Sequence, residues 1–150
     1  MPSAMYRLAL VCLLGAAPFV QAAQAADSPP STQAPDLTKV RALIKAKDYR
    51  AAIVQLNGLV STQNADVYNL MGFAQRKSGD QANGMAYYQR ALAIDPKHKG
   101  ALEYQGQLFV ELGQMDKARE NQAALRRLCP SGCEELTDLN EAIAHPPKAR

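Results

Sequence analysis

The chain has 150 residues, enough for one modest domain, and its formal net charge at neutral pH is +3. A charge this close to zero gives no reason to expect nucleic acid or an anionic membrane as a partner. Motifs of hydrolases, nucleotide-binding enzymes and metalloproteases are missing from the sequence. We therefore expect no enzymatic activity, no metal and no cofactor.

The N-terminus has the layout of a secretory signal peptide. Arg7 is the lone charge before an apolar run from Leu8 to Val20, and small residues follow up to Ala26. The run of about 13 residues is shorter than the ~20 that a membrane-spanning helix needs, so an uncleaved anchor is the weaker alternative. We expect residues 1–25 to be removed by cleavage after Ala25, or after Ala22 as second choice, which would leave a soluble periplasmic protein without a membrane span.

Residues 26–35 and 36–64 lead into the main part of the chain. Segment 26–35, ADSPPSTQAP, is rich in proline and is expected to form a flexible spacer. Asp36 can cap a following helix, and a turn at 47–49 leads to a second helix with apolar residues at helical spacing. Residues 36–64 are therefore expected to form a helical hairpin, either a degenerate copy of the unit that follows or a plain hairpin that caps it.

Residues 65–98 and 99–132 are two copies of one 34-residue unit. The copies share glycines and a closing proline, which pair as Gly72 with Gly106, Gly79 with Gly113, and Pro96 with Pro130. Asn64 and Asp80 can cap the two helices of the first copy. A period near 34 with turn glycines and a closing proline is typical of a helix–turn–helix repeat, and it resembles the tetratricopeptide repeat family.

The resemblance implies an all-α fold, an α-solenoid of antiparallel helix pairs wound into a right-handed superhelix. We interpret the chain as a small exported bacterial protein of this kind, which binds other proteins and has no chemistry of its own. Gly72 and Gly84 are expected where the two helices of 65–98 press closest, although Gly84 could instead be a tolerated weak position.

Residues 133–145 are expected to form a helix that caps the solenoid, followed by a loose tail at 146–150. Ser131 and Glu134 fit a capping box at its start. Leu136, Leu139 and Ile143 give the helix one apolar face, and the last repeat of a solenoid needs such a cover.

By resemblance, the first helices of successive repeats line a concave groove that binds a peptide or protein partner. The candidate groove residues are Arg41, Ile44, Lys45, Asp66, Asn69, Phe73, Arg76, Lys77, Glu103, Gln107, Val110 and Glu111. The basic members among them would place positive charge at one end of the groove, as a clamp for the C-terminal carboxylate of a peptide requires. The alternative is that they are ordinary solvated residues. Phe73 is either an apolar anchor for the ligand or a packing contact with the neighbouring repeat.

Cys129 and Cys133 remain after Cys12 is lost with the signal peptide, and an oxidising compartment favours their pairing. The predicted disulfide would join the last repeat to the capping helix and stabilise the fold by about 2 kcal/mol. A redox-active pair and a metal site are the alternatives. Three intervening residues weaken the first, and the distance of His98 and His145 in sequence weakens the second.

The sequence thus predicts an adaptor or scaffold of the cell envelope that binds a peptide or protein segment in its groove. Two other classes of function remain open: a thiol-redox accessory protein that uses Cys129 and Cys133, and a structural protein that associates with itself.

Overall fold

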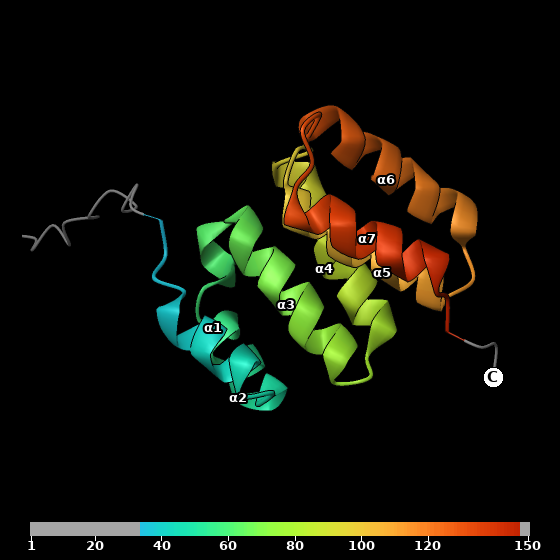
Figure 1. Cartoon of the computed structure of the whole chain (residues 1–150). Helices are drawn as coiled ribbons and strands as arrows, with labels where there is room; N and C mark the ends of the chain where they lie inside the picture. Colours follow the sequence, from blue (N-terminus) through green and yellow to red (C-terminus); the bar gives the residue numbers. More distant parts are fainter. Residues whose placement is uncertain (1–33, 148–150) are drawn as a thin grey trace, which may run out of the picture. The chain divides into compact units, whose positions relative to one another are not determined.

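The computed structural model describes residues 34–147, and this part of the chain is entirely helical, without a strand (Figure 1). The elements in chain order are α1 (Thr38–Lys45), α2 (Tyr49–Asn57), the short 3-10 helix η1 (Val60–Thr62), α3 (Ala65–Lys77), α4 (Gln81–Ile94), α5 (Lys99–Glu111), α6 (Met115–Leu128) and α7 (Glu134–Ala144). The expected signal peptide, the spacer up to residue 33 and the tail from residue 148 lie outside the described residues. None of the described helices has the length and apolar character needed to cross a bilayer.

Consecutive helices pack as pairs, which confirms the all-α solenoid expected from the sequence. Tight turns join the two helices of each pair, and each turn holds one residue with positive φ. This residue is Gly79 (φ 96°) between α3 and α4, and Gly113 (φ 71°) between α5 and α6. Lys47 (φ 59°) takes the same place between α1 and α2, where the sequence lacks a glycine. The first pair therefore has the turn geometry of the others without their turn residue.

Side-chain caps begin several of the helices. Asn64 accepts hydrogen bonds from the backbone N–H groups of Asp66 and Val67 at the start of α3, at 2.9 and 3.2 Å. Asp80 accepts a hydrogen bond from the backbone N–H of Asn83 at the start of α4, at 3.0 Å. Hydrogen bonds from the backbone and the side chain of Asn83 hold the pKa of Asp80 below its usual value. Each cap satisfies an N–H group that the helix itself leaves free.

The capping box expected at Ser131 is wrong. Helix α7 begins at Glu134 with Cys133 as its N-cap, and no side chain caps it. Cys133 is extended (φ −156°) directly after the positive-φ turn residue Gly132. The helix therefore starts too late for Ser131 to reach its first turn, and Glu134 occupies the first helical position, where it cannot reach back as a capping box requires.

Glycines allow the closest helix contacts in the repeats. A Cβ atom on Gly72 would lie 2.7 Å from the ring of Tyr88 on α4, and one on Gly84 would lie 3.1 Å from the backbone oxygen of Gly72. Both glycines thus stand where α3 and α4 press together. Gly84 has a packing role, and the alternative of a merely tolerated weak position is wrong.

Helix α7 covers the end of the last repeat. It lies against α5 and α6 (Figure 1), and its Leu139 is fully buried with Leu102 and Leu125. A Cβ atom on Gly106 would lie 2.7 Å from the side chain of Leu139. Gly106 of α5 therefore leaves room for the leucine through which the capping helix docks.

Candidate functional site

The first helices of the pairs, α1, α3 and α5, together with α7, carry the candidate binding residues. We call one set of their side chains the first-helix face. It consists of Arg41, Asn69, Phe73, Arg76, Lys77, Glu103, Tyr104, Gln107, Glu111, Glu134 and Asp138.

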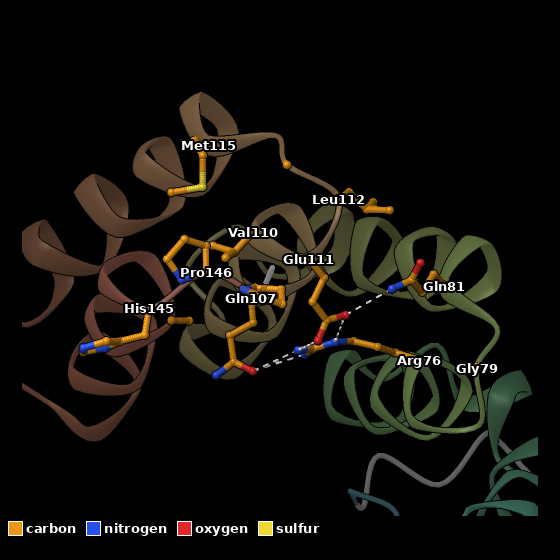
Figure 2. A pocket seen from close by; sticks show the side chains of 13 residues that line it. Arg76, Gly79, Gln81, Gln107, Val110, Glu111, Leu112, Met115, His145 and Pro146 are labelled. Carbon is orange, nitrogen blue, oxygen red and sulfur yellow. Dashed lines mark hydrogen bonds and ion pairs between the residues drawn. The ribbon is translucent and has the colours of Figure 1, made fainter. Parts of the chain in front are cut away.

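Arg76 of α3 is fully engaged by groups of α5. Its guanidinium donates to both carboxylate oxygens of Glu111, at 2.6 and 3.1 Å, and to Gln107 Oε1 at 3.2 Å (Figure 2). It also donates to the backbone oxygen of Tyr104. Its side chain is only 4% exposed. Arg76 therefore acts as a link between two repeats, and its charge is not available to the carboxylate of a ligand.

The ion pair between Arg76 and Glu111 sets the pKa of both partners. Burial by itself would lower the pKa of Arg76, but the hydrogen bond and charge of Glu111 outweigh burial and raise it. Burial would raise the pKa of Glu111, but the hydrogen bond and charge of Arg76 outweigh it and lower the pKa. Gln81 of α4 also donates to Glu111, at 3.3 Å, so the carboxylate joins three helices.

An aromatic row crosses the first-helix face. Phe73 of α3 contacts Tyr104 of α5, with ring centroids 4.8 Å apart, and Tyr49 of α2 with centroids 6.2 Å apart. Phe73 is half-buried, and the Lys77 ammonium lies 5.5 Å from its ring centroid. Of the two predicted roles of Phe73, the structure provides packing against neighbouring repeats, and part of the ring remains exposed beside Lys77.

Tyr88 of α4 continues this row beneath the face. Its ring centroid lies 6.3 Å from that of Tyr104, and its hydroxyl is buried without a hydrogen bond in the described part of the chain. Burial raises the pKa of Tyr88 far above its usual value, and the nearby charge of Arg76 opposes that rise without reaching hydrogen-bonding geometry.

Glu103 is a buried carboxyl group on α5, the helix against which α7 packs. It is 5% exposed, and its Oε1 accepts a hydrogen bond from Gln107 at 2.9 Å. Burial, followed by the charges of Asp138, Glu135 and Glu134 on α7, raises the pKa of Glu103 to about 8. Glu103 is therefore mostly protonated at neutral pH.

A cleft of about 1050 Å³ opens at the edge of the first-helix face, where α3, α5 and α7 end and α6 begins (Figure 2). Its polar wall is the network of Arg76, Gln107 and Glu111. Its apolar wall consists of Val110, Leu112, Met115, Ala142, Pro146 and Pro147. Leu112 is 43% exposed and leaves apolar surface free at the cleft.

The remaining groove candidates differ in exposure and in their contacts. Arg41 and Lys45 are exposed on α1, and Val110 is 4% exposed at the cleft. Asp66 binds His98 Nε2 at 3.1 Å. Asn69 is 6% exposed, its Oδ1 has no partner in the described residues, and its Nδ2 lies 3.0 Å from where a Cβ on Gly100 would be. The positive end expected from Arg41, Lys45, Arg76 and Lys77 thus loses Arg76 to Glu111.

Several residues of the site were not found by sequence reasoning. Tyr104 lies one position after the groove candidate Glu103, and its ring packs against Phe73 of α3. His98 caps α5 by accepting the N–H of Ala101 at 3.1 Å. Leu112 and Met115 could have been found from the sequence, because one apolar residue precedes and one closely follows the turn glycine, Gly113.

Cys129 and Cys133 lie with their Sγ atoms next to each other, at the junction of α6 and α7. The carboxylate of Glu135 is within 4.8 Å of both sulfur atoms, so three groups that could bind a metal are close together. Glu135 also pairs with Lys99 at 3.6 Å. Three ligands are one fewer than a structural zinc site uses, and no fourth protein ligand joins them among the described residues.

A comparison with known protein families gave a match. Residues 65–98, which comprise α3 and α4, match the family model of the tetratricopeptide repeat. No curated protein matched the chain significantly. Tetratricopeptide repeats generally mediate protein–protein interactions.

Proposed function

We propose that the protein is an exported, non-enzymatic interaction module that binds a peptide or protein segment on its first-helix face and in the adjoining cleft. It would serve as an adaptor or scaffold in the cell envelope. The tetratricopeptide repeat at 65–98 supports the general class, because such repeats bind proteins.

The cleft beside Arg76 and Glu111 is the observation that carries the proposal. It offers exposed apolar surface at Leu112 and Met115 next to a polar network whose atoms are already held in place. A bound segment gains affinity from burying apolar side chains there, and it does not have to order the polar wall on binding. Such an arrangement of an apolar patch and fixed polar groups suits a short peptide better than a small reactive substrate.

Two features of the chain support export. The N-terminal sequence has the layout of a signal peptide, and the neighbouring sulfur atoms of Cys129 and Cys133 suit a disulfide, which persists in an oxidising compartment. We propose that this bridge is structural and ties α6 to α7. Cell fractionation and N-terminal sequencing of the product test the export: a periplasmic chain that begins at Ala26 is the expected result.

Selection from a random peptide library tests the binding role. The protein, purified after expression of its full-length sequence, would be used to enrich peptides, and dissociation constants of the enriched peptides would be measured by fluorescence anisotropy. Leu112→Ser is expected to weaken binding about five- to tenfold, because part of the leucine surface is lost from the interface.

Ile94→Ser is the matched control. Ile94 is 46% exposed, close to the 43% of Leu112, and does not line the cleft. This variant should bind as tightly as the wild type. Equal weakening by both substitutions would place the binding surface elsewhere, and a library that yields no binder would argue against the proposed function itself.

A further inference from the structure

We infer that the segment bound on the first-helix face has charges of opposite sign at its two ends, with its basic end against α7 and its acidic end toward α1. The inference rests on the proposed function and names the chemistry of the partner. It replaces the carboxylate clamp expected from the sequence with a different charge pattern.

The clamp is disfavoured by the state of its central cation. Arg76 pairs with both oxygens of Glu111, and it is almost completely buried. A peptide carboxylate would have to displace Glu111 and leave it unpaired in a half-buried place, which costs more than the exchange returns.

The side of the face formed by α5 and α7 is acidic. Glu134 and Asp138 are exposed on α7, which packs against α5, and after burial their charges contribute to the raised pKa of Glu103. Among the described residues, no Lys or Arg side-chain nitrogen lies within 4.0 Å of a carboxylate oxygen of Glu103, Glu134 or Asp138. Glu103 Oε1 receives one hydrogen bond, from Gln107, and its Oε2 receives none from the described residues. A basic side chain of a partner would supply the charge and donors that this side of the face lacks.

The opposite side of the same face is basic. Arg41 on α1 and Lys77 on α3 are exposed, and no ion pair engages either of them in the described part of the chain. Phe73 connects the two sides: the Lys77 ammonium lies 5.5 Å from its ring centroid, and the ring of Tyr104, the residue after Glu103, lies 4.8 Å from it. A continuous row of side chains therefore joins the basic group on α3 to the acidic residues of α5.

Charge complementarity thus favours a segment with charges at both ends over a uniformly charged one. A uniformly basic segment would meet Arg41 and Lys77, and a uniformly acidic one would meet Glu134 and Asp138. Like charges in contact cost several kcal/mol across an interface and so select against both.

Four synthetic peptides with the same apolar centre test the inference. One has two Lys at one end and two Glu at the other, and the others carry only Lys, only Glu, or no charge. The peptide with both charges is expected to bind most tightly. Glu134→Gln with Asp138→Asn should weaken it about three- to tenfold, and Arg41→Gln should weaken it by a smaller factor. Glu120→Gln with Arg126→Gln, two exposed residues of α6, should leave binding unchanged.

Proton release gives a second readout. A cation docked beside Glu103 stabilises its carboxylate, so binding at pH 7 should release roughly half a proton or more. Titration calorimetry in phosphate and in Tris measures this release, and Glu103→Gln should abolish it.

The two levels of the proposal fail in different ways. If the uncharged peptide or a uniformly charged one binds as tightly as the peptide with both charges, the inference is wrong while the proposed function stands. Tight binding without proton release would also overturn it, because the basic end would then lie away from Glu103. If neither these peptides nor the library contains a binder, the proposed function is wrong, and the inference that rests on it is wrong as well.

Discussion

Lys47 occupies a backbone conformation that its two counterparts reach with glycine. Its φ of 59° lies in the left-handed region, as do Gly79 and Gly113 in the equivalent turns. A side chain in this region is strained by about 1–2 kcal/mol, while glycine adds entropy to the unfolded chain. Lys47→Gly is therefore expected to raise the free energy of unfolding by about 0.5–1 kcal/mol, measured by urea denaturation.

The reverse change at Gly113 is the matched test of this explanation. A Cβ atom there would meet nothing within 4 Å, so Gly113→Ala probes the backbone conformation without a clash. It should lower the free energy of unfolding by about 1 kcal/mol. If Lys47→Ala stabilised the protein as much as Lys47→Gly, the gain would come from removing the lysine and not from relieving backbone strain.

The helices that carry the first-helix face were predictable from the sequence, whereas the contacts of its residues were not. The position of Arg76 within the repeat marked it as a groove residue, and it does lie on α3 beside α5. Its pairing with Glu111, 35 residues later, depends on the distance between two helices, which local sequence patterns do not encode. The same limit hid the burial of Glu103, because a carboxylate on a helix is expected in solvent until the helix that covers it is placed.

At the scale of helix pairs, Gly72 makes a prediction about packing. A Cβ atom there would lie 2.7 Å from the fully buried ring of Tyr88 and 3.0 Å from the backbone oxygen of Gly84. The backbone cannot move away without separating α3 from α4. Gly72→Ala is expected to lower the free energy of unfolding by about 1–3 kcal/mol, despite the better helix propensity of alanine.

Gly58→Ala provides the control for Gly72→Ala. Gly58 has an ordinary helical φ of −68°, and a Cβ atom on it would make only a van der Waals contact of 3.5 Å. This variant should be within about 0.5 kcal/mol of the wild type in the same denaturation experiment. Equal stability of both variants would mean that α3 and α4 adjust to the added methyl group.

The junction between α6 and α7 gives a second prediction at this scale. Reducing the proposed bridge between Cys129 and Cys133 should lower the free energy of unfolding by about 2 kcal/mol, because the short loop is no longer constrained. Thermal unfolding with and without a strong reductant measures the change, and Cys133→Ser should be insensitive to the reductant. A bridge that opens in millimolar glutathione with no loss of stability would instead favour the redox role.

Elements were predictable where the sequence repeats and less so where it stops repeating. The 34-residue period marked the helix pairs α3–α4 and α5–α6, because turn glycines and apolar spacing act locally. The start of α7 was predicted wrongly. Residues 131–134 have the sequence pattern of a capping box, but the preceding turn decides whether such a pattern lies at the start of a helix. Gly132 and the extended Cys133 delay the helix by two residues.

For the whole molecule, the buried carboxyl group of Glu103 predicts how stability changes with pH. The pKa of Glu103 is about 8 in the folded protein and near the ordinary 4.5 in the unfolded chain. Between these values the folded state holds a proton that the unfolded state has lost, so stability decreases as pH rises. The free energy of unfolding should fall by about 1–3 kcal/mol between about pH 5 and pH 8 from this group.

Glu103→Gln separates this effect from the other titrating groups. Glutamine keeps an oxygen that can accept from Gln107 Nε2, as Glu103 Oε1 does, but it carries no charge against Asp138, Glu135 and Glu134. The variant should lose most of the decline between pH 5 and pH 8 and should be more stable than the wild type at pH 8. The Arg76–Glu111 pair does not produce the same slope, because the lowered pKa of Glu111 gives stability that is lost as pH falls from the ordinary value of 4.5 through the lower folded value. Parallel curves for wild type and variant would show that Glu103 ionises freely, and that α7 does not shield it from solvent.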